Sequence, residues 1–201
     1  NNIRLNSLSD VKETLARVKA PLIVMKPLVE SQNANKLLDT LENVTVIWIY
    51  RNYIDVALSD LQKFPSTSGR GNLKPILDCD ENNWRSQNVP KELVEKVKAI
   101  YSEELTELDC ACLFWYVRNS LFFYQGLDNH PKVLLWKYED LVHNPEYHFT
   151  NLSSILGFEL TQYAFSNAFS SESIRKDSPK EVHSAVKALC EDLLVKLDRY
   201  K

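Results

Sequence analysis

The stretch VTVIWIYRNYIDVALSD, residues 44–60, decides the fold of this chain. Its first part, 44–50, is an apolar run rich in β-branched and aromatic residues, which predicts a strand buried on both faces. Arg51 ends the run. From residue 54 on, apolar side chains recur with helical spacing, so the pattern predicts a helix over 54–64. A buried strand that leads directly into a helix is the repeating unit of a parallel α/β sheet.

Two further runs, PLIVMK (21–26) and KVLLWKY (132–138), have the same character and are predicted as parallel strands. Helical periodicity marks the segments between and after them, which are residues 9–19, 33–41, 54–64, 91–104, 107–126, 145–156 and 179–200. Glycine, proline and small polar residues over 65–83 predict a mobile loop. We therefore expect an α/β fold with a mostly parallel central sheet flanked by helices.

Length and charge restrict the class of protein further. A chain of 201 residues with 44% hydrophobic content is expected to form one domain, 1–201. The net charge of −3, from 24 basic and 27 acidic residues, offers no overall attraction to nucleic acid, so any anion site must be local. No run of eighteen apolar residues is present, so no membrane span is expected.

The cysteines indicate a reducing compartment. The chain has four of them, Cys79, Cys110, Cys112 and Cys190, which are too few for a disulfide scaffold and form no paired CxxC motif for zinc. Cys110 and Cys112 are two residues apart in a predicted helix and therefore lie on different faces, as buried structural residues. We expect reduced thiols, no metal and a cytoplasmic protein.

Arg51 is the main candidate for an anion ligand. In an open parallel sheet, ligands bind beyond the carboxyl ends of the strands, where helix N-termini are found. A guanidinium there can hold a phosphate through two parallel hydrogen bonds, and Ser59, nearly two helical turns further on, could add a hydroxyl donor. The alternative is that Arg51 pairs with Asp55 on the surface. The pattern alone leaves both interpretations open.

The order Arg51, Asn52, Asp55, Val56, Ser59 resembles the sulfotransferases that use 3′-phosphoadenosine-5′-phosphosulfate. In that family a strand ends in Arg, followed by Asn or Asp, then Asp-Val, and a Ser eight residues after the Arg. FWYVRN (114–119) and VLLWKYEDLVHNPEYHFTNLSSILGF (133–158) are similar to the family's later helix and YEDL segment. The resemblance covers about residues 21–158 and implies a P-loop, nucleotide-kinase-like fold.

The resemblance also implies roles for individual residues. Arg51 and Ser59 are implied to bind the 3′-phosphate of the nucleotide. The segment SIRKDSPKEVHSAVKALC is similar to the family's basic loop and final helix, so Arg175 and Lys176 could complete that site. The alternative for these two is a solvated pair beside Asp177. No segment matches the family's phosphosulfate-binding loop, and we expect that loop and its strand to precede Asn1 or to be lost.

Sulfuryl transfer needs a base for the acceptor hydroxyl and positive charge near the bridging oxygen. Relatives place a histidine soon after their second strand, and here Glu30 occupies the corresponding position after PLIVMK. Glu30 is the candidate base, with a helix N-terminal Glu that binds backbone N–H groups as the alternative. Lys26, at the predicted strand end, is the candidate for contacting the sulfate or bridging oxygen. Its alternative is a solvated lysine.

Two polar pairs are predicted to have structural roles. Glu139 and Asp140 of the YEDL segment are expected to fix the strand end and cap neighbouring backbone. Arg118 and Asn119 lie in an aromatic helix, where a buried hydrogen bond is expected for at least one of them.

The sequence thus predicts a sulfotransferase that moves a sulfuryl group from 3′-phosphoadenosine-5′-phosphosulfate to a hydroxyl of a small-molecule acceptor, without a metal. The alternative is a non-catalytic domain that binds 3′,5′-bisphosphoadenosine. A phosphotransferase would need a Walker-type loop and a carboxylate for Mg²⁺, and neither is found. The acceptor and the oligomeric state are not specified by the sequence.

Overall fold

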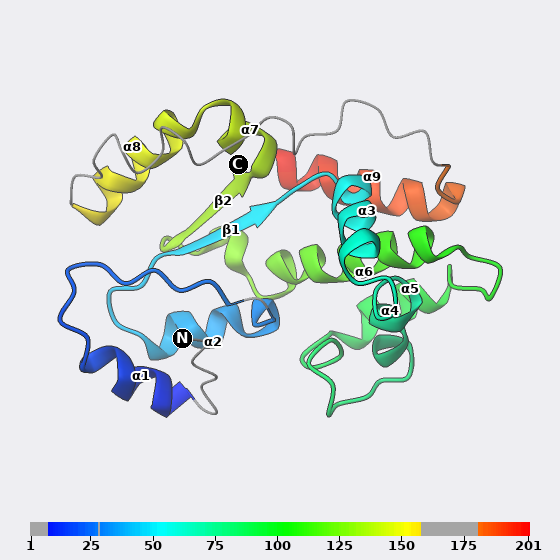
Figure 1. Cartoon of the computed structure of the whole chain (residues 1–201), viewed down its shortest axis with the longest axis horizontal. Coiled ribbons are helices and arrows are strands. Elements are labelled where there is room, and N and C mark those ends of the chain that lie inside the picture. Colours follow the sequence, from blue (N-terminus) through cyan, green and yellow to red (C-terminus); the bar gives the residue numbers. More distant parts are fainter. Residues whose placement is uncertain (1–7, 28, 158–180) are drawn as a thin grey trace.

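The computed structural model describes residues 8–27, 29–157 and 181–201 (Figure 1). Its elements, in chain order, are α1 (Leu8–Ala16), η1 (Ser31–Asn33), α2 (Ala34–Thr40), β1 (Val46–Tyr50), α3 (Tyr53–Lys63), α4 (Arg70–Leu77), α5 (Lys91–Lys98), α6 (Glu107–Tyr124), η2 (Leu127–Asn129), β2 (Val133–Lys137), α7 (Tyr138–His143), α8 (Pro145–Leu156) and α9 (Ser184–Asp198).

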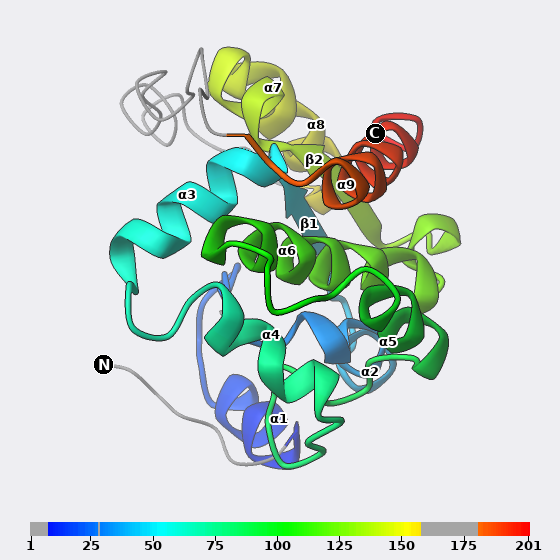
Figure 2. The ribbon, with the colours of Figure 1, turned by 90° about the vertical axis from the view of Figure 1, so that its right-hand side faces the viewer.

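Strands β1 and β2 pair in parallel, in a register that runs from Val46 opposite Val133 to Tyr50 opposite Lys137. Helices cover this pair (Figures 1 and 2). The prediction of an α/β fold with a parallel sheet flanked by helices is therefore confirmed. In the described part of the chain the sheet has two strands. Parallel pairing places Arg51 and Tyr138, the residues that follow the two strands, next to each other.

The two faces of the sheet belong to separate apolar clusters, as the alternation of side chains along a strand requires. Trp48 and Leu135 belong to the larger cluster, which includes most of α6, and the Trp48 ring lies 5.7 Å from that of Phe122. Ile47 and Trp136 belong to the smaller cluster, with residues of α7 and α8. The strands are thus held between α6 on one face and α7 and α8 on the other.

Helix α6 is the central helix of the larger cluster, and α3, α4 and α9 pack against it (Figure 2). It begins with a capping box, in which Thr106 and Asp109 exchange side-chain-to-backbone hydrogen bonds. Cys110 and Cys112 are fully buried in it, and burial raises the pKa of the Cys112 thiol to about 12. All four cysteines are free thiols, as predicted.

The prediction of a strand over 21–26 is wrong. The segment has no regular structure, and the Val24 side chain is 83% exposed. A strand needs a neighbour for its backbone N–H and C=O groups, and no strand among the described residues pairs with this segment. Lys26 is therefore not at a strand end.

The prediction of a loop over 65–83 is also wrong in its centre, where α4 forms. Leu73 and Ile76 of α4 are fully buried, and α4 packs against α6. Gly69 begins the helix at φ 60, where a Cβ would lie 2.3 Å from the Glu107 carboxylate, so only glycine fits this approach. Burial against α6 outweighs the turn-forming composition of the segment.

The other predicted helices are present, and some of them are shorter than predicted. The predicted 91–104 ends at Lys98, and the predicted 179–200 is seen as Ser184–Asp198. The short α7, directly after β2, was not predicted. Helix α8 begins at Pro145 and ends at Leu156, followed by Gly157 at φ 67, as its sequence predicts. In the described residues, no helix combines the length and the apolarity that crossing a bilayer demands.

Candidate active site

The turn from β1 into α3 is fixed by Asn52. Its side-chain Oδ1 accepts a hydrogen bond from the Ile54 N–H at 2.9 Å, so Asn52 is the N-cap of α3. Its own backbone N–H donates to Glu139 Oε1 at 3.0 Å. The sequence therefore builds a helix N-terminus directly at the carboxyl end of the strand, and a residue from the second strand end supports it.

The Arg51 side chain lies at this strand end, and it is mostly buried. Its Nη2 is 3.1 Å from Asp55 Oδ2, and the two side chains are 19% and 7% exposed. Its guanidinium lies 4.9 Å from the centre of the Tyr138 ring, and the Trp115 indole N–H donates to the Arg51 carbonyl at 3.1 Å. The pair with Asp55 that we considered as an alternative exists, but it is a partly buried pair within a cluster and not a surface pair.

Ser59 lies on α3 one turn beyond Asp55. Residues four apart in a helix share a face, so Ser59 follows Asp55, the partner of Arg51, along the same side of α3. Ser59 is half-buried, and its hydroxyl forms no hydrogen bond within the part of the chain that the structure describes. The hydroxyl is thus available to a ligand at this face.

Glu139 has the structural role predicted for it, since its Oε1 accepts from the Asn52 backbone. Its Oε2 is buried and has no hydrogen-bond partner among the described residues. Asp140 pairs with Lys201 at 2.7 Å instead of capping backbone. A carboxylate at the end of β2 thus secures the turn that presents Arg51.

Glu30 lies in the turn before α2. Its Oε2 accepts from Asn33 Nδ2 at 2.8 Å, and it makes no side-chain hydrogen bond to the backbone of η1. The alternative of a backbone-capping Glu is therefore not what the structure shows. Lys26 is exposed in the irregular segment before this turn. Arg175 and Lys176 lie outside the described residues.

The surroundings of Glu30 include a cationic cluster that sequence reasoning identified only in part. Arg118 donates to Ser31 Oγ and to Gln32 Oε1, which confirms the buried hydrogen bond predicted for this position. Burial lowers the pKa of Arg118 to about 10, although the Glu30 carboxylate acts in the opposite direction. Arg118 thus holds the turn that contains Glu30.

Trp84 extends this cluster. The Arg118 guanidinium lies 5.3 Å, and the Arg85 guanidinium 4.5 Å, from the centre of the Trp84 ring. Arg85 in turn donates to Asn72 at 2.7 Å. Trp84 and Arg85 were not predicted as neighbours of the turn that contains Glu30, because they follow the predicted loop 65–83 in a stretch to which the sequence assigned no element.

Tyr138 and Trp115 are the residues around Arg51 that sequence reasoning missed. Tyr138 could have been found by register, since it follows β2 as Arg51 follows β1. Trp115 lies in the predicted aromatic helix and is a core residue, at 3% exposed. Nothing in the sequence indicates that its indole N–H reaches a carbonyl 64 residues away.

Among the residues that the structure describes, no group of three or more His, Cys, Asp or Glu side chains is arranged to hold a metal ion. The model of the sulfotransferase domain family matches residues 7–189 of the chain. No curated protein and no solved structure gives a significant match to it.

Proposed function

Because the chain belongs to the sulfotransferase domain family, we propose that it transfers a sulfuryl group from 3′-phosphoadenosine-5′-phosphosulfate to a hydroxyl of a small molecule. The single observation that favours this donor is the position of Arg51. Its guanidinium lies at the carboxyl end of a parallel strand pair, beside the N-terminus of α3, where α/β folds bind phosphorylated ligands.

The Arg51 environment is compatible with a phosphate ligand. A guanidinium has five N–H donors, and the ion pair with Asp55 engages Nη2 at 3.1 Å. Asp55 and Tyr138 hold the guanidinium in place before a ligand arrives, which reduces the side-chain entropy lost on binding. The Ser59 hydroxyl, on the same face of α3, supplies a neutral donor. We propose that Arg51 and Ser59 bind the 3′-phosphate, with Arg175 and Lys176 completing the site.

The proposed reaction is an in-line displacement at sulfur. The acceptor oxygen forms a bond to sulfur, the bond from sulfur to the 5′-phosphate oxygen breaks, and adenosine 3′,5′-bisphosphate leaves. Glu30 takes the proton of the acceptor hydroxyl. We propose that Lys26 offsets the charge that grows on the leaving oxygen.

Arg118 is proposed as a positioning residue for the base. It binds Ser31 and Gln32, the two residues that follow Glu30, and so fixes the turn that presents the carboxylate. The four free thiols fit a reducing compartment, so we propose that the reaction takes place in the cytoplasm.

The proposal is tested by incubating the chain with the donor and a panel of phenols, alcohols and amino sugars, and detecting sulfated products by mass spectrometry. A product with wild type, but not with Arg51→Ala, is expected. Lys91→Ala, an exposed residue at the start of α5, is the matched control and should retain activity. Nucleotide binding without product across the panel would favour a non-catalytic nucleotide-binding domain. The absence of both would overturn the proposal.

A further inference from the structure

The side chains of Asn88, Asn33 and Glu30 form a hydrogen-bond relay. Asn88 Nδ2 donates to Asn33 Oδ1 at 2.8 Å, and Asn33 Nδ2 donates to Glu30 Oε2 at 2.8 Å. Asn33 and Glu30 belong to the turn before α2, whereas Asn88 is 55 positions away from Asn33, in the segment between α4 and α5. The fold thus connects the candidate base to a distant segment of the chain.

The chemistry of the groups fixes the direction of both bonds. An ionised carboxylate only accepts hydrogen bonds, so the Asn33 amide must turn its NH2 group toward Glu30. The Asn33 Oδ1 then faces Asn88, which can bind it only as a donor. Asn88 therefore sets which way round the Asn33 amide lies.

The relay engages one oxygen of the Glu30 carboxylate and leaves the other one available. Oε2 accepts from Asn33, whereas Oε1 accepts no hydrogen bond within the described part of the chain. A base must lie within hydrogen-bond distance of the hydroxyl that it deprotonates. A bond that fixes Oε2 also fixes the direction in which Oε1 is presented to that hydroxyl.

Other contacts hold the turn itself. Arg118 donates to Ser31 Oγ and to Gln32 Oε1. Gln125 Nε2 donates to the Ser31 carbonyl at 2.8 Å. None of these bonds involves Asn88, so a change at Asn88 should alter the carboxylate's orientation without unfolding the turn.

We propose that Asn33 and Asn88 are positioning residues for the base. Asn88 orients the Asn33 amide, and this amide holds Oε2 of Glu30 so that Oε1 takes the proton of the acceptor hydroxyl. The inference rests on the reaction proposed above, in which Glu30 is the base.

Asn88→Asp is the decisive variant. Aspartate accepts hydrogen bonds but does not donate them, and like asparagine it tolerates the positive φ of 56 at this position. The Asn33 amide should therefore rotate, donate to the new carboxylate and turn its oxygen toward Glu30. With the acceptor that gives product in the panel above, kcat should fall about tenfold and the KM for the nucleotide should not change. Asn33→Ala should lower kcat similarly.

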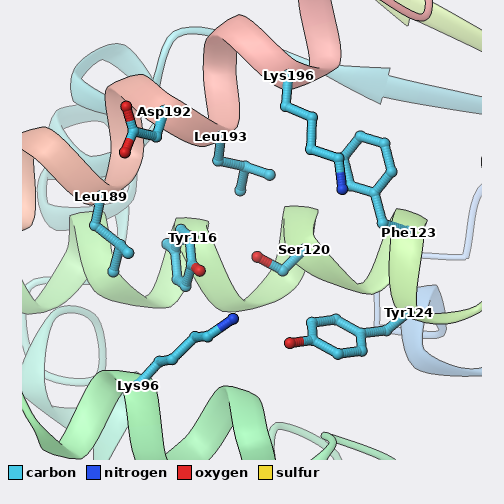
Figure 3. Close-up of a pocket in the computed structure, with 9 residues that line it drawn as sticks. All are labelled: Lys96, Tyr116, Ser120, Phe123, Tyr124, Leu189, Asp192, Leu193 and Lys196. Carbon is cyan, nitrogen blue, oxygen red and sulfur yellow. The ribbon is translucent and has the colours of Figure 1, made fainter.

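Two controls separate the relay from unspecific effects. Asn82→Asp makes the same chemical change at an exposed position of the same segment. Asp192→Asn changes a charge in the pocket between α5, α6 and α9, and Figure 3 shows the side chains that line this pocket, none of which belongs to the relay. Both variants should keep the parental kcat.

The side-chain amide resonance of Asn33 in NMR spectra tests the relay without any need for activity. Glu30→Gln should shift this resonance in the parent chain, because the two groups are bonded. In the Asn88→Asp background it should not, because the amide has turned away. Equal shifts in both backgrounds, or a parental kcat for Asn88→Asp, would overturn the relay. A wild-type chain that forms no product overturns the proposed reaction, and the resonance then still decides whether Asn88 orients Asn33.

Discussion

The backbone N–H of Asn52 donates a hydrogen bond to the Glu139 carboxylate at 3.0 Å, which joins the turn after β1 to the first turn of α7. The two residues are 87 positions apart in the sequence, yet they follow adjacent strand ends. This bond holds the two residues that flank the candidate phosphate site, Arg51 and Tyr138, at a fixed separation.

Removal of the Glu139 carboxylate should therefore destabilise the fold. Glu139→Ala is expected to lower the free energy of unfolding by about 1–3 kcal/mol, because it leaves the Asn52 N–H without its acceptor. Glu139→Gln retains an acceptor oxygen and should lower the free energy of unfolding by less than Glu139→Ala does. Glu146→Ala, at an exposed position of α8, is the control for chemical denaturation. Equal effects of Glu139→Ala and Glu146→Ala would contradict the role of this bond.

Arg51→Ala should weaken the binding of two adenosine nucleotides to different extents. Binding of adenosine 3′,5′-bisphosphate should weaken by about 2–4 kcal/mol, whereas adenosine 5′-phosphate, which lacks the 3′-phosphate, should bind almost as before. Calorimetry measures both. Comparison of the two nucleotides cancels any loss of folded protein caused by leaving Asp55 unpaired. Equal losses for both nucleotides would exclude Arg51 as the ligand of the 3′-phosphate.

Glu30→Gln should lower turnover by on the order of a hundredfold or more, with nucleotide affinity nearly unchanged, because the basic lone pair is lost. The amide retains an oxygen that can accept from Asn33, so the turn should persist. Glu42→Gln, an exposed residue after α2, is the control. A variant that turns over at the parental rate per folded molecule but unfolds at a lower temperature would assign Glu30 a structural role.

Asp198 should make the free energy of unfolding depend on pH in the acidic range. It accepts from the Tyr50 hydroxyl at 2.5 Å and from Lys137 Nζ at 2.9 Å. Burial alone would raise the pKa of Asp198, but these hydrogen bonds outweigh it and the pKa is lowered. A carboxyl whose pKa is lower in the folded state stabilises the fold above its unfolded pKa, and this contribution is lost as pH falls through the folded pKa.

Asp198→Asn should accordingly be about 1–2 kcal/mol less stable than wild type at neutral pH. The difference should narrow below about pH 4, close to the unfolded pKa of Asp. Urea denaturation at several pH values measures it. Asp39→Asn, at an exposed position of α2, should show no such narrowing. A stability difference that is constant with pH would contradict the charged role of Asp198.

Leu73→Ala tests whether α4 is part of the core. Leu73 is fully buried, so its truncation should lower the free energy of unfolding by about 2–5 kcal/mol. Lys74→Ala, on the exposed side of the same helix, should cost less than 1 kcal/mol, roughly the value of its surface pair with Asp78. Thermal or denaturant unfolding measures both. Similar, small effects of the two changes would contradict the core position of α4 and support a surface loop at this segment.

The sequence by itself determined the strand–turn–helix unit of residues 46–63. Its apolar run, its Asn cap and its helical spacing are local features, and neighbouring residues suffice to form them. The same reasoning found β2, α6 and α8, whose patterns are also continuous in the chain. The order of residues around Arg51 was likewise enough to predict the sulfotransferase family.

Only the tertiary structure decided the secondary structure of segments 21–26 and 70–77. The first has the composition of a strand but no strand beside it in the described residues, and the second has the composition of a loop but a hydrophobic surface of α6 to pack against. The contacts of Arg51 with Tyr138 and Trp115 also come from distant parts of the chain. A strand needs a partner for its backbone and a buried side chain needs an opposing surface, and both are supplied by residues that the local sequence does not contain.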